Sequence, residues 1–223
     1  MNRSIYFLFV LVLLSKAAFS QKTIISKEFD ANQIKNLEVM SDGGSINVIG
    51  GTNAFVKVNL NQNSSAETLE NVMLNYDITI EIQNETLVCR KKLKSDRNWK
   101  DVPSLNFEIG IPVRCNSNLK TAGGAILLTG LNGTHNFKTS GGAFQIKQMK
   151  GELNGKTSGG MIDVEDSEGN INLTTSGGAI KAKGLKGKVK LLTSGGSLNL
   201  NHLTGEIDAS TSGGGIKVDK IDG

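Results

Sequence analysis

The sequence has 223 residues, with 25 Lys and Arg against 21 Asp and Glu, so its formal net charge at pH 7 is only +4. The two kinds of charge are interleaved and aromatic residues make up 5% of the chain, which argues against a nucleic-acid partner. Glycine occurs 27 times and proline twice, a ratio that excludes a collagen or a disordered linker and predicts many tight turns.

Residues 1–20 have the pattern of a secretory signal peptide. Arg3 supplies a short positive region, an apolar run follows at positions 5–14, and Ala18-Phe19-Ser20 is a small-x-small cleavage pattern. The apolar run is too short for a membrane-spanning helix, which needs about 20 residues. We therefore expect a mature chain that begins at Gln21, has no transmembrane segment, and resides in the periplasm, on the outer-membrane surface or outside the cell.

Residues 21–112 carry strand patterns of uneven length and predict an irregular N-terminal β region. Residues 42–48 hold a Gly-Gly pair followed by alternating apolar residues, like a degenerate copy of the repeat in the second half. Ser64 and Glu67 have the spacing of a capping box, so a short inserted helix is expected over residues 65–75. Further strands are expected at 54–60, 76–83, 86–92 and 105–111, the middle two as a hairpin, with a polar loop at 94–103 that carries Trp99.

Cys89 and Cys115 are the only cysteines. An exported chain can pair them in a disulfide, and two independent buried thiols are the other interpretation, so both remain open. Two cysteines without a nearby histidine cluster make a poor zinc site.

The second half of the chain is a repeat of 18 residues without insertion or deletion. Each repeat has a Gly-Gly pair, a threonine two residues before it and a single glycine ten residues after its first member, a regularity typical of repeat architectures. The pairs begin at Gly123, Gly141, Gly159, Gly177, Gly195 and Gly213, the threonines are Thr121, Thr139, Thr157, Thr175, Thr193 and Thr211, and the single glycines are Gly133, Gly151, Gly169, Gly187, Gly205 and Gly223.

Each repeat contains two strand patterns, one after the Gly-Gly pair and one after the single glycine. Ile162 and Val164 are apolar in the first strand of one repeat, and Ile171 and Leu173 in the second, so the parity of the inward positions changes between them. That change indicates a corner. We expect the glycines to lie at the corners, where a Cβ would prevent close approach of the coils, and replacement of Gly159 by Val to disrupt the stack.

The predicted fold is therefore all-β, a right-handed single-stranded β-solenoid with two strands in each 18-residue coil. The regular repeats span residues 113–223, one continuous solenoid domain is expected over 37–223, and the irregular half forms an N-terminal cap, since repeat arrays need atypical ends. The last coil has no obvious cap, so end-to-end self-association through it is one expected contact.

Three repeated positions of the coil are candidate binding sites. The calcium-binding β-roll also has 18-residue coils, but its ligand positions are apolar here, as Met161 and Ile162 illustrate. The threonines share parity with the inward residues, so we interpret them as an internal hydroxyl ladder and not as an ice-binding array. A column of outward serines has no histidine beside it that would act as a base, so it does not predict a nucleophilic site. These serines are Ser140, Ser158, Ser176, Ser194 and Ser212.

Four acidic residues gather in one coil, but neighbouring coils carry lysines at equivalent positions, which indicates charge balance and not catalysis. The acids are Asp163, Glu165, Asp166 and Glu168, and the lysines are Lys147, Lys150, Lys183 and Lys186. We expect the outward faces to be solvated and to form no groove of one charge sign. His135 is predicted to point inward and His202 to lie at a corner, both as structural residues. The sequence therefore predicts no catalytic, metal-binding or cofactor-binding residue.

The motif Thr-Ser-Gly-Gly-x-Ile-x-Val, followed by Gly-x-Ile-x-Leu-x-Thr, resembles a bacterial family of β-strand-repeat proteins grouped as adhesins, whose relatives include head domains of autotransporter-like adhesins. The resemblance covers residues 119–223 closely and residues 37–112 loosely. It implies a non-enzymatic binding or structural module in the envelope of a Gram-negative bacterium, with a surface glycan or an envelope protein as partner. It transfers no site residue. The alternative is a carbohydrate-active parallel β-helix enzyme, a lyase or hydrolase.

Overall fold

The computed structural model describes residues 22–60, 68–94, 96, 98, 100 and 102–222. The signal-peptide prediction for residues 1–20 lies outside these residues, as do Ser64, Glu67 and Trp99. None of the helices in the described ranges has the length and apolar character needed to cross a bilayer.

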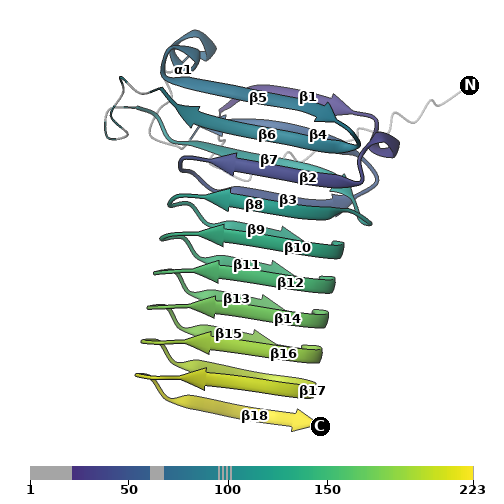
Figure 1. The fold of residues 1–223 in the computed structure, drawn as a ribbon, viewed down its shortest axis with the longest axis vertical. Coiled ribbons are helices and arrows are strands. Elements are labelled where there is room, and N and C mark those ends of the chain that lie inside the picture. The colour runs from purple at the N-terminus through teal and green to yellow at the C-terminus, as the bar shows by residue number, and fades with distance from the viewer. Residues whose placement is uncertain are drawn as a thin grey trace, which may run out of the picture.

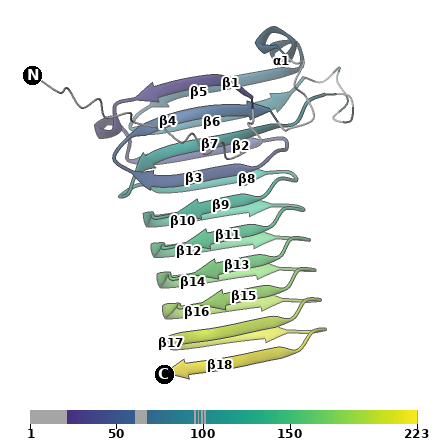
Figure 2. The ribbon, with the colours of Figure 1, turned by 180° about the vertical axis from the view of Figure 1, so that it is seen from behind.

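The second half of the chain is a β-solenoid of 18-residue coils, each with one strand in a front sheet and one in a back sheet (Figures 1 and 2). Strands pair in parallel at a register of 18 residues, so Leu153 lies opposite Ile171 and Ile162 opposite Ile180. The front strands are β8 (Asn116–Thr121), β10 (Asn132–Thr139), β12 (Lys150–Thr157), β14 (Glu168–Thr175), β16 (Lys186–Thr193) and the second half of β17 (Leu198–Thr211). The back strands are β9 (Ile126–Thr129), β11 (Phe144–Lys147), β13 (Ile162–Glu165), β15 (Ile180–Lys183), the first half of β17 and β18 (Ile216–Asp222).

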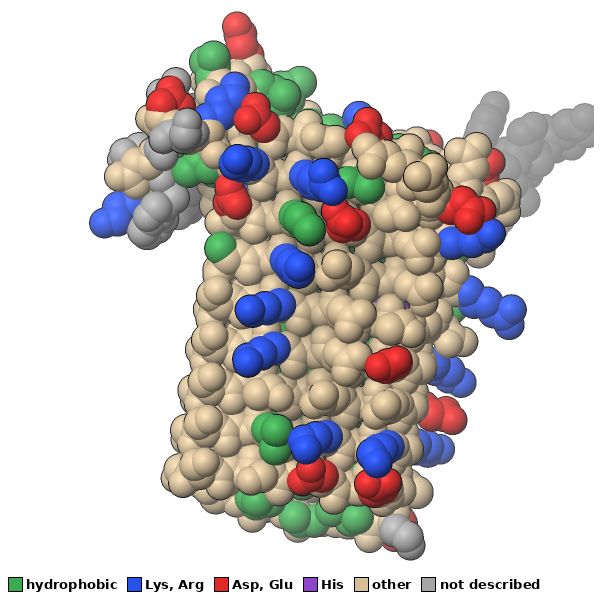
Figure 3. Space-filling model, viewed as in Figure 1, with side chains coloured by type: hydrophobic (Ala, Val, Ile, Leu, Met, Phe, Trp, Pro, Cys, Tyr) green, Lys and Arg blue, Asp and Glu red, His purple; other side chains and the backbone are tan. Residues whose placement is uncertain are grey.

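The predicted coil and its handedness are confirmed. In both views the regular strands nearest to the viewer run from right to left while the chain descends, so the winding is right-handed (Figures 1 and 2). Burial alternates along the strands, as in β14, where Ile171, Leu173 and Thr175 are buried and the residues between them are partly or fully exposed. The outward side chains are mostly polar or charged (Figure 3). The two-residue period therefore places one side chain in the core and the next in solvent.

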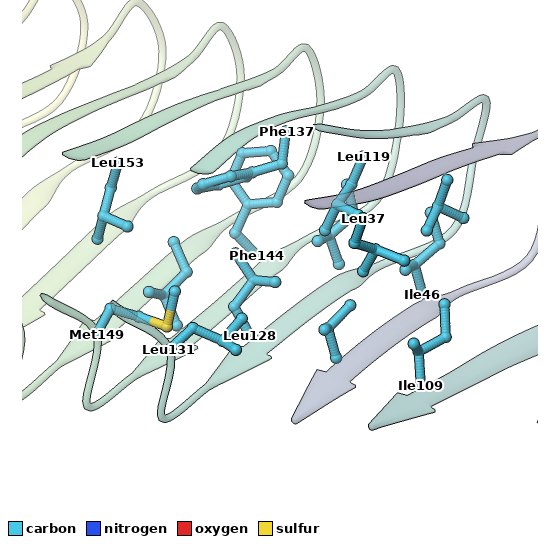
Figure 4. Close-up of a cluster of buried hydrophobic side chains, with 14 of the residues drawn as sticks. Leu37, Ile46, Ile109, Leu119, Leu128, Leu131, Phe137, Phe144, Met149 and Leu153 are labelled. Atoms are coloured by element: carbon cyan, nitrogen blue, oxygen red, sulfur yellow. The ribbon is translucent and has the colours of Figure 1, made fainter. Parts of the chain in front are cut away.

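The core is a single apolar column between the two sheets, and Figure 4 shows part of it. Phe137 from the front sheet meets Phe144 from the back sheet edge to face, with ring centroids 4.9 Å apart. Gly155, one coil below Phe137, leaves room for that ring, because a Cβ there would lie 2.3 Å from its Cε2 atom. The small residue of one coil thus makes room for the large ring of the coil before it.

The second glycine of each Gly-Gly pair is the position where coils approach most closely. A Cβ on Gly160 would lie 1.9 Å from the carbonyl oxygen of Gly142 in the preceding coil, whereas a Cβ on Gly159 would be 3.8 Å from its nearest neighbour. The same difference recurs at each later pair, with the second-glycine distance between 2.0 and 2.2 Å. The close approach of the coils therefore requires glycine at Gly160, whereas the expected effect of Gly159→Val stays a prediction.

The single glycines from Gly133 to Gly205 lie inside the front strands and not at the corners, which corrects the second part of the glycine prediction. Gly151 is the second residue of β12 and pairs with Gly133 and Gly169 in strand register. Its φ is 106°, and a Cβ on it would lie 2.3 Å from the carbonyl oxygen of Gly133. The corner itself is a column of residues with left-handed φ between 48° and 71°, namely Gly130, Gln148, Asp166, Gly184, His202 and Lys220.

The repeated threonines form the predicted internal ladder. The hydroxyl of Thr175 donates to the carbonyl oxygen of Gly160 at 2.8 Å and accepts from the backbone N–H of Gly178 at 3.3 Å. The donated bond recurs in all six repeats at 2.7 to 3.0 Å. Each hydroxyl thus links its own coil to the preceding one at the Gly-Gly turn.

The coil made by β2 (Asn36–Ser41) and β3 (Ile46–Gly51) belongs to the same stack, as predicted for residues 42–48. It lies between the coil of β6 (Thr86–Leu93) and β7 (Leu105–Pro112) and the first regular coil, so spatial order differs from chain order (Figure 1). The hydroxyl of Thr121 donates to the carbonyl of Gly44 at 2.9 Å, although the two residues are 77 positions apart. This contact is the same one that later threonines make to the coil directly before them.

The remaining N-terminal elements form a mixed sheet above that coil. β1 (Thr23–Phe29) pairs antiparallel with β4 (Ala54–Leu60), which pairs antiparallel with β7, and β5 (Tyr76–Gln83) forms the predicted hairpin with β6. The strand β1 and the short 3-10 helix η1 (Ala31–Gln33) were not predicted. The inserted helix, α1 (Leu69–Asn75), begins after Thr68, whose side chain accepts from the N–H of Asn71.

Both cysteines are buried free thiols, so the second of the two interpretations holds. Burial raises the pKa of each thiol to about 12, for Cys89 against the smaller opposing effect of Lys27. Both side chains are protonated at physiological pH and pack as small apolar residues.

Candidate functional site

Three lysines form a column of one charge sign on the outward face of the front sheet. Lys120, Lys138 and Lys156 lie on β8, β10 and β12 and face one another in parallel register, so their strands are about 4.8 Å apart. All three side chains are exposed, and none forms an ion pair with an acidic residue that the structure describes. Figure 3 shows basic side chains stacked along this face. The expectation of no one-sign groove is therefore wrong here.

A column of asparagines runs beside the lysines, two residues earlier on each strand. Because side chains at i and i+2 share a face, Asn136 and Lys138 point to the same side of β10. The Nδ2 of Asn154 donates to Oδ1 of Asn136 at 3.3 Å and to Oε1 of Glu152 at 3.0 Å. The column consists of Asn118, Asn136, Asn154 and Asn172.

The two columns line a shallow open groove with a volume of about 270 Å³. Its long direction follows the stack and crosses the strands, since both columns repeat from coil to coil. Phe137 and Leu119 lie beneath it with their side chains in the core, and Thr174 ends the lysine column on β14. We name the outward residues of this groove (Asn118, Lys120, Asn136, Lys138, Asn154, Lys156, Asn172 and Thr174) the lysine–asparagine face.

Other outward columns balance their charges between coils, as the sequence predicts. The Nζ of Lys147 lies 3.1 Å from Glu165, and that of Lys190 lies 3.1 Å from Asp208. A hydrogen bond from Lys147 to Glu165 and its negative charge raise the pKa of the lysine. Glu168 lies 3.9 Å from Lys150. Two members of the acidic group are thus occupied by lysines of the preceding coil, and Asp163 faces Lys181 in register.

The two histidines lie where the sequence places them. His135 is fully buried in the inward column of the front sheet, with its Nδ1 2.9 Å from the hydroxyl of Ser117 and its Nε2 without a partner. Burial lowers its pKa to about 4, so the ring is neutral at pH 7. His202 is exposed at a corner with a φ of 54°. The outward serines are exposed, and the described part of the chain contains no group of three or more metal-ligating side chains.

A second cavity, with a volume of about 670 Å³, lies where the N-terminal sheet meets the stack. Lys91 is 2% exposed at its wall, and its Nζ donates to the carbonyls of Gly43 at 2.6 Å and Leu105 at 2.8 Å. The ammonium lies 5.3 Å from the centroid of the Tyr76 ring. Burial lowers its pKa to about 8, against the opposing effect of Asp42. These bonds tie three strand ends together, so Lys91 connects the cap to the stack.

Sequence reasoning missed both features, although a signal for each exists. The lysines recur at intervals of 18 residues and are therefore visible once the repeat is known. Lys91 shares the parity of the buried residues Leu87 and Cys89 on β6, which marks it as an inward lysine.

No protein-family model matches the chain, and no curated protein matches it in sequence. Its structure is similar to a "putative cell adhesion protein" of Clostridium sporogenes, with 14% identity, a TM-score of 0.39, and coverage of 88% of this chain and 98% of the other. It is also similar to a "putative adhesin" of Bacteroides fragilis, with 11% identity, a TM-score of 0.41, and coverage of 89% and 98%. With identities this low and TM-scores below 0.5, neither likeness determines what this chain binds.

Proposed function

We propose that this chain is a non-enzymatic binding module of the cell envelope, of the adhesin type. The observation that carries the proposal is the lysine–asparagine face, a groove lined by side chains that repeat in register over four coils. A face of this kind suits an extended ligand that makes the same contact several times.

The rigidity of the stack supports this function. Each front strand is bonded in register to the strands above and below, and a threonine links every Gly-Gly turn to the next. Ligand groups therefore meet side chains whose spacing is set in advance, which reduces the ordering cost of binding. Weak contacts at successive coils then add up as linked binding events do.

The positions of the acidic residues favour binding over hydrolysis. A carbohydrate-cleaving site needs an acid and a base that are both available to the substrate. Glu165 is 3.1 Å from Lys147, and Glu168 is 3.9 Å from Lys150. These two carboxylates serve the packing of coil on coil.

The first experiment mixes the purified exported chain with polysaccharide extracted from bacterial envelopes and measures both binding and polymer length. We expect saturable binding with the polymer length unchanged. Shortening of the polymer that disappears on Glu165→Gln or Asp166→Asn would overturn the proposal and indicate an enzyme. A complete lack of binding to any envelope fraction would also overturn it and indicate a purely structural role.

The second experiment locates the module by protease treatment of intact cells that carry an epitope-tagged full chain, with a periplasmic protein as control. Loss of the tag while the control survives is the result expected of an adhesin. Protection of the tag until the outer membrane is opened would exclude adhesion and assign the binding to a periplasmic ligand.

A further inference from the structure

We infer that the lysine–asparagine face binds a linear acidic polysaccharide, whose carboxylate or sulfate groups pair with Lys120, Lys138 and Lys156. This inference rests on the proposed function and names the ligand class of the same face. Its starting point is that the lysines are stacked on one another, whereas several nearby outward columns place opposite charges in successive coils.

Stacked lysines are electrostatically unfavourable in the chain alone. Like charges directly opposite on neighbouring strands repel, and these three lysines follow one another at the strand spacing of about 4.8 Å. The column at Lys188 and Glu206 avoids this cost with an ion pair of 3.0 Å between successive coils. A ligand with negative groups at the same spacing removes the repulsion and gains three attractive contacts.

The geometry of the groove fits a chain of sugars that lies along the stack. Negative groups on such a chain recur at every residue or every second residue, and the lysines offer partners at about 4.8 Å and about 9.6 Å. The asparagine amides beside them carry both donors and acceptors, which suit the hydroxyl groups of sugar rings. The groove is shallow and open at the face, so the polymer has no need to thread through the protein.

The side chains of this face favour a polysaccharide over a single-stranded nucleic acid. Nucleic-acid grooves of this type place aromatic rings outward so that bases stack on them. The aromatic residue under this groove, Phe137, is 3% exposed and directed into the core against Phe144. The outward positions of the lysine–asparagine face are Lys, Asn and Thr.

The test compares wild type with a variant that carries Lys120→Gln, Lys138→Gln and Lys156→Gln. The probes are polygalacturonate, a linear polyuronate, and the same polymer after methyl esterification, which keeps the hydroxyls but removes the charge. A matched control carries Lys181→Gln, Lys183→Gln and Lys217→Gln, which remove the same total charge from exposed positions of the back sheet. Thermal unfolding of all three proteins verifies that each is folded.

We expect wild type and control to bind polygalacturonate with the same affinity, and the front-sheet variant to bind it at least about tenfold more weakly. The methyl ester should bind to each of the three proteins more weakly than polygalacturonate binds to wild type. Raising the salt concentration should weaken the wild-type interaction. Equal affinity of the front-sheet variant and wild type would overturn the inference while leaving the proposed function intact. Binding of the methyl ester as tightly as of polygalacturonate would also overturn it. If single-stranded DNA binds more tightly than polygalacturonate and this binding depends on the three lysines, the ligand is a nucleic acid and the inference is overturned. If wild type binds no envelope polysaccharide, the proposed function is overturned as well.

Discussion

The hydroxyl of Thr157 donates a 2.8 Å hydrogen bond to the carbonyl oxygen of Gly142, and a Cβ on Gly160 would lie 1.9 Å from that same oxygen. The threonine and the second glycine of one repeat thus act on one atom of the preceding coil. The glycine lets the two turns approach, and the threonine satisfies the carbonyl that this approach buries. The pairing explains why the two residue types recur together at the same offset.

Replacement of Gly160 by Ala should destabilise the stack by about 3 kcal/mol or more. The new methyl group overlaps the backbone of Gly142, which cannot move without shifting its own coil, and overpacking of this kind costs 1–3 kcal/mol or more. Urea unfolding followed by circular dichroism measures the loss.

The matched control is Gly159→Ala, one residue earlier in the same turn. A Cβ there lies 3.8 Å from its nearest neighbour, and φ is not in the left-handed region, so the change in stability should stay within about 0.5 kcal/mol. Similar losses for the two variants would contradict the assignment of close approach to the second glycine.

Replacement of Thr157 by Val should cost about 1–3 kcal/mol, because it keeps the shape of the buried side chain and leaves the partly buried carbonyl of Gly142 without this hydrogen bond. Ser158→Ala removes an exposed hydroxyl from the next position and serves as control. Equal unfolding midpoints for Thr157→Val and wild type would show that the ladder contributes no stability.

The corner column predicts changes of opposite sign at two positions. Gln148 has a φ of 54°, so Gln148→Gly should raise the free energy of unfolding by about 0.5 to 1 kcal/mol, since glycine adopts this conformation without strain. Gly130 has a φ of 71°, and the nearest atom to its Cβ position is the carbonyl oxygen of Gly50 at 3.8 Å, so Gly130→Ala meets no clash but should lower the free energy of unfolding by about 1 kcal/mol through backbone strain. Gln145→Gly, inside strand β11, is the control for Gln148→Gly and should destabilise.

The regular half of the fold is predictable from sequence because its register is local. Gly160 must lie against Gly142 18 residues earlier, and no insertion interrupts that interval anywhere in the repeats. Parity of the apolar residues then determines which side chains enter the core. The inward direction of His135 and the threonine ladder follow from the same rule.

The position of the β2–β3 coil was not predictable in this way. Thr121 contacts Gly44 across 77 residues, and nothing near either residue indicates that the intervening chain folds back above the β2–β3 coil. The lysine–asparagine face was missed for another reason. Lys120 and Lys138 are visible as a repeat, but their like charges stand out only against the front-sheet ion pairs of later coils, such as that of Lys188 with Glu206.

The buried histidine should make stability depend on pH between about 6.5 and about 4. The pKa of His135 is lowered to about 4 by burial, against about 6.5 in an unfolded chain, so in this window the unfolded state binds more protons. The free energy of unfolding is therefore unaffected by this group above pH 6.5 and falls by up to about 3 kcal/mol as the pH drops to about 4. Chemical denaturation at a series of pH values measures it.

The control for this prediction is His135→Leu, which introduces the apolar type found at Leu153 in the next coil. Between pH 6.5 and 4 the free energy of unfolding of wild type should fall relative to that of the variant by up to about 3 kcal/mol, because the variant lacks the titrating ring. His202→Asn keeps His135 and should retain the wild-type profile. A pH profile that is the same in wild type and His135→Leu would exclude the buried ring as its origin.

Removal of the middle lysine of the column should stabilise the protein in dilute salt. Lys138 has a like charge on each side in register, so Lys138→Gln removes two repulsive pairs and should raise the free energy of unfolding by about 0.5 to 1 kcal/mol. The gain should largely disappear at about 1 M salt, where the Debye length falls to about 3 Å. Lys183→Gln is the matched control, because Lys183 faces Glu165 in register and its loss should not stabilise. A gain for Lys138→Gln that is equal at low and high salt would show that packing, and not charge repulsion, limits the stability of this face.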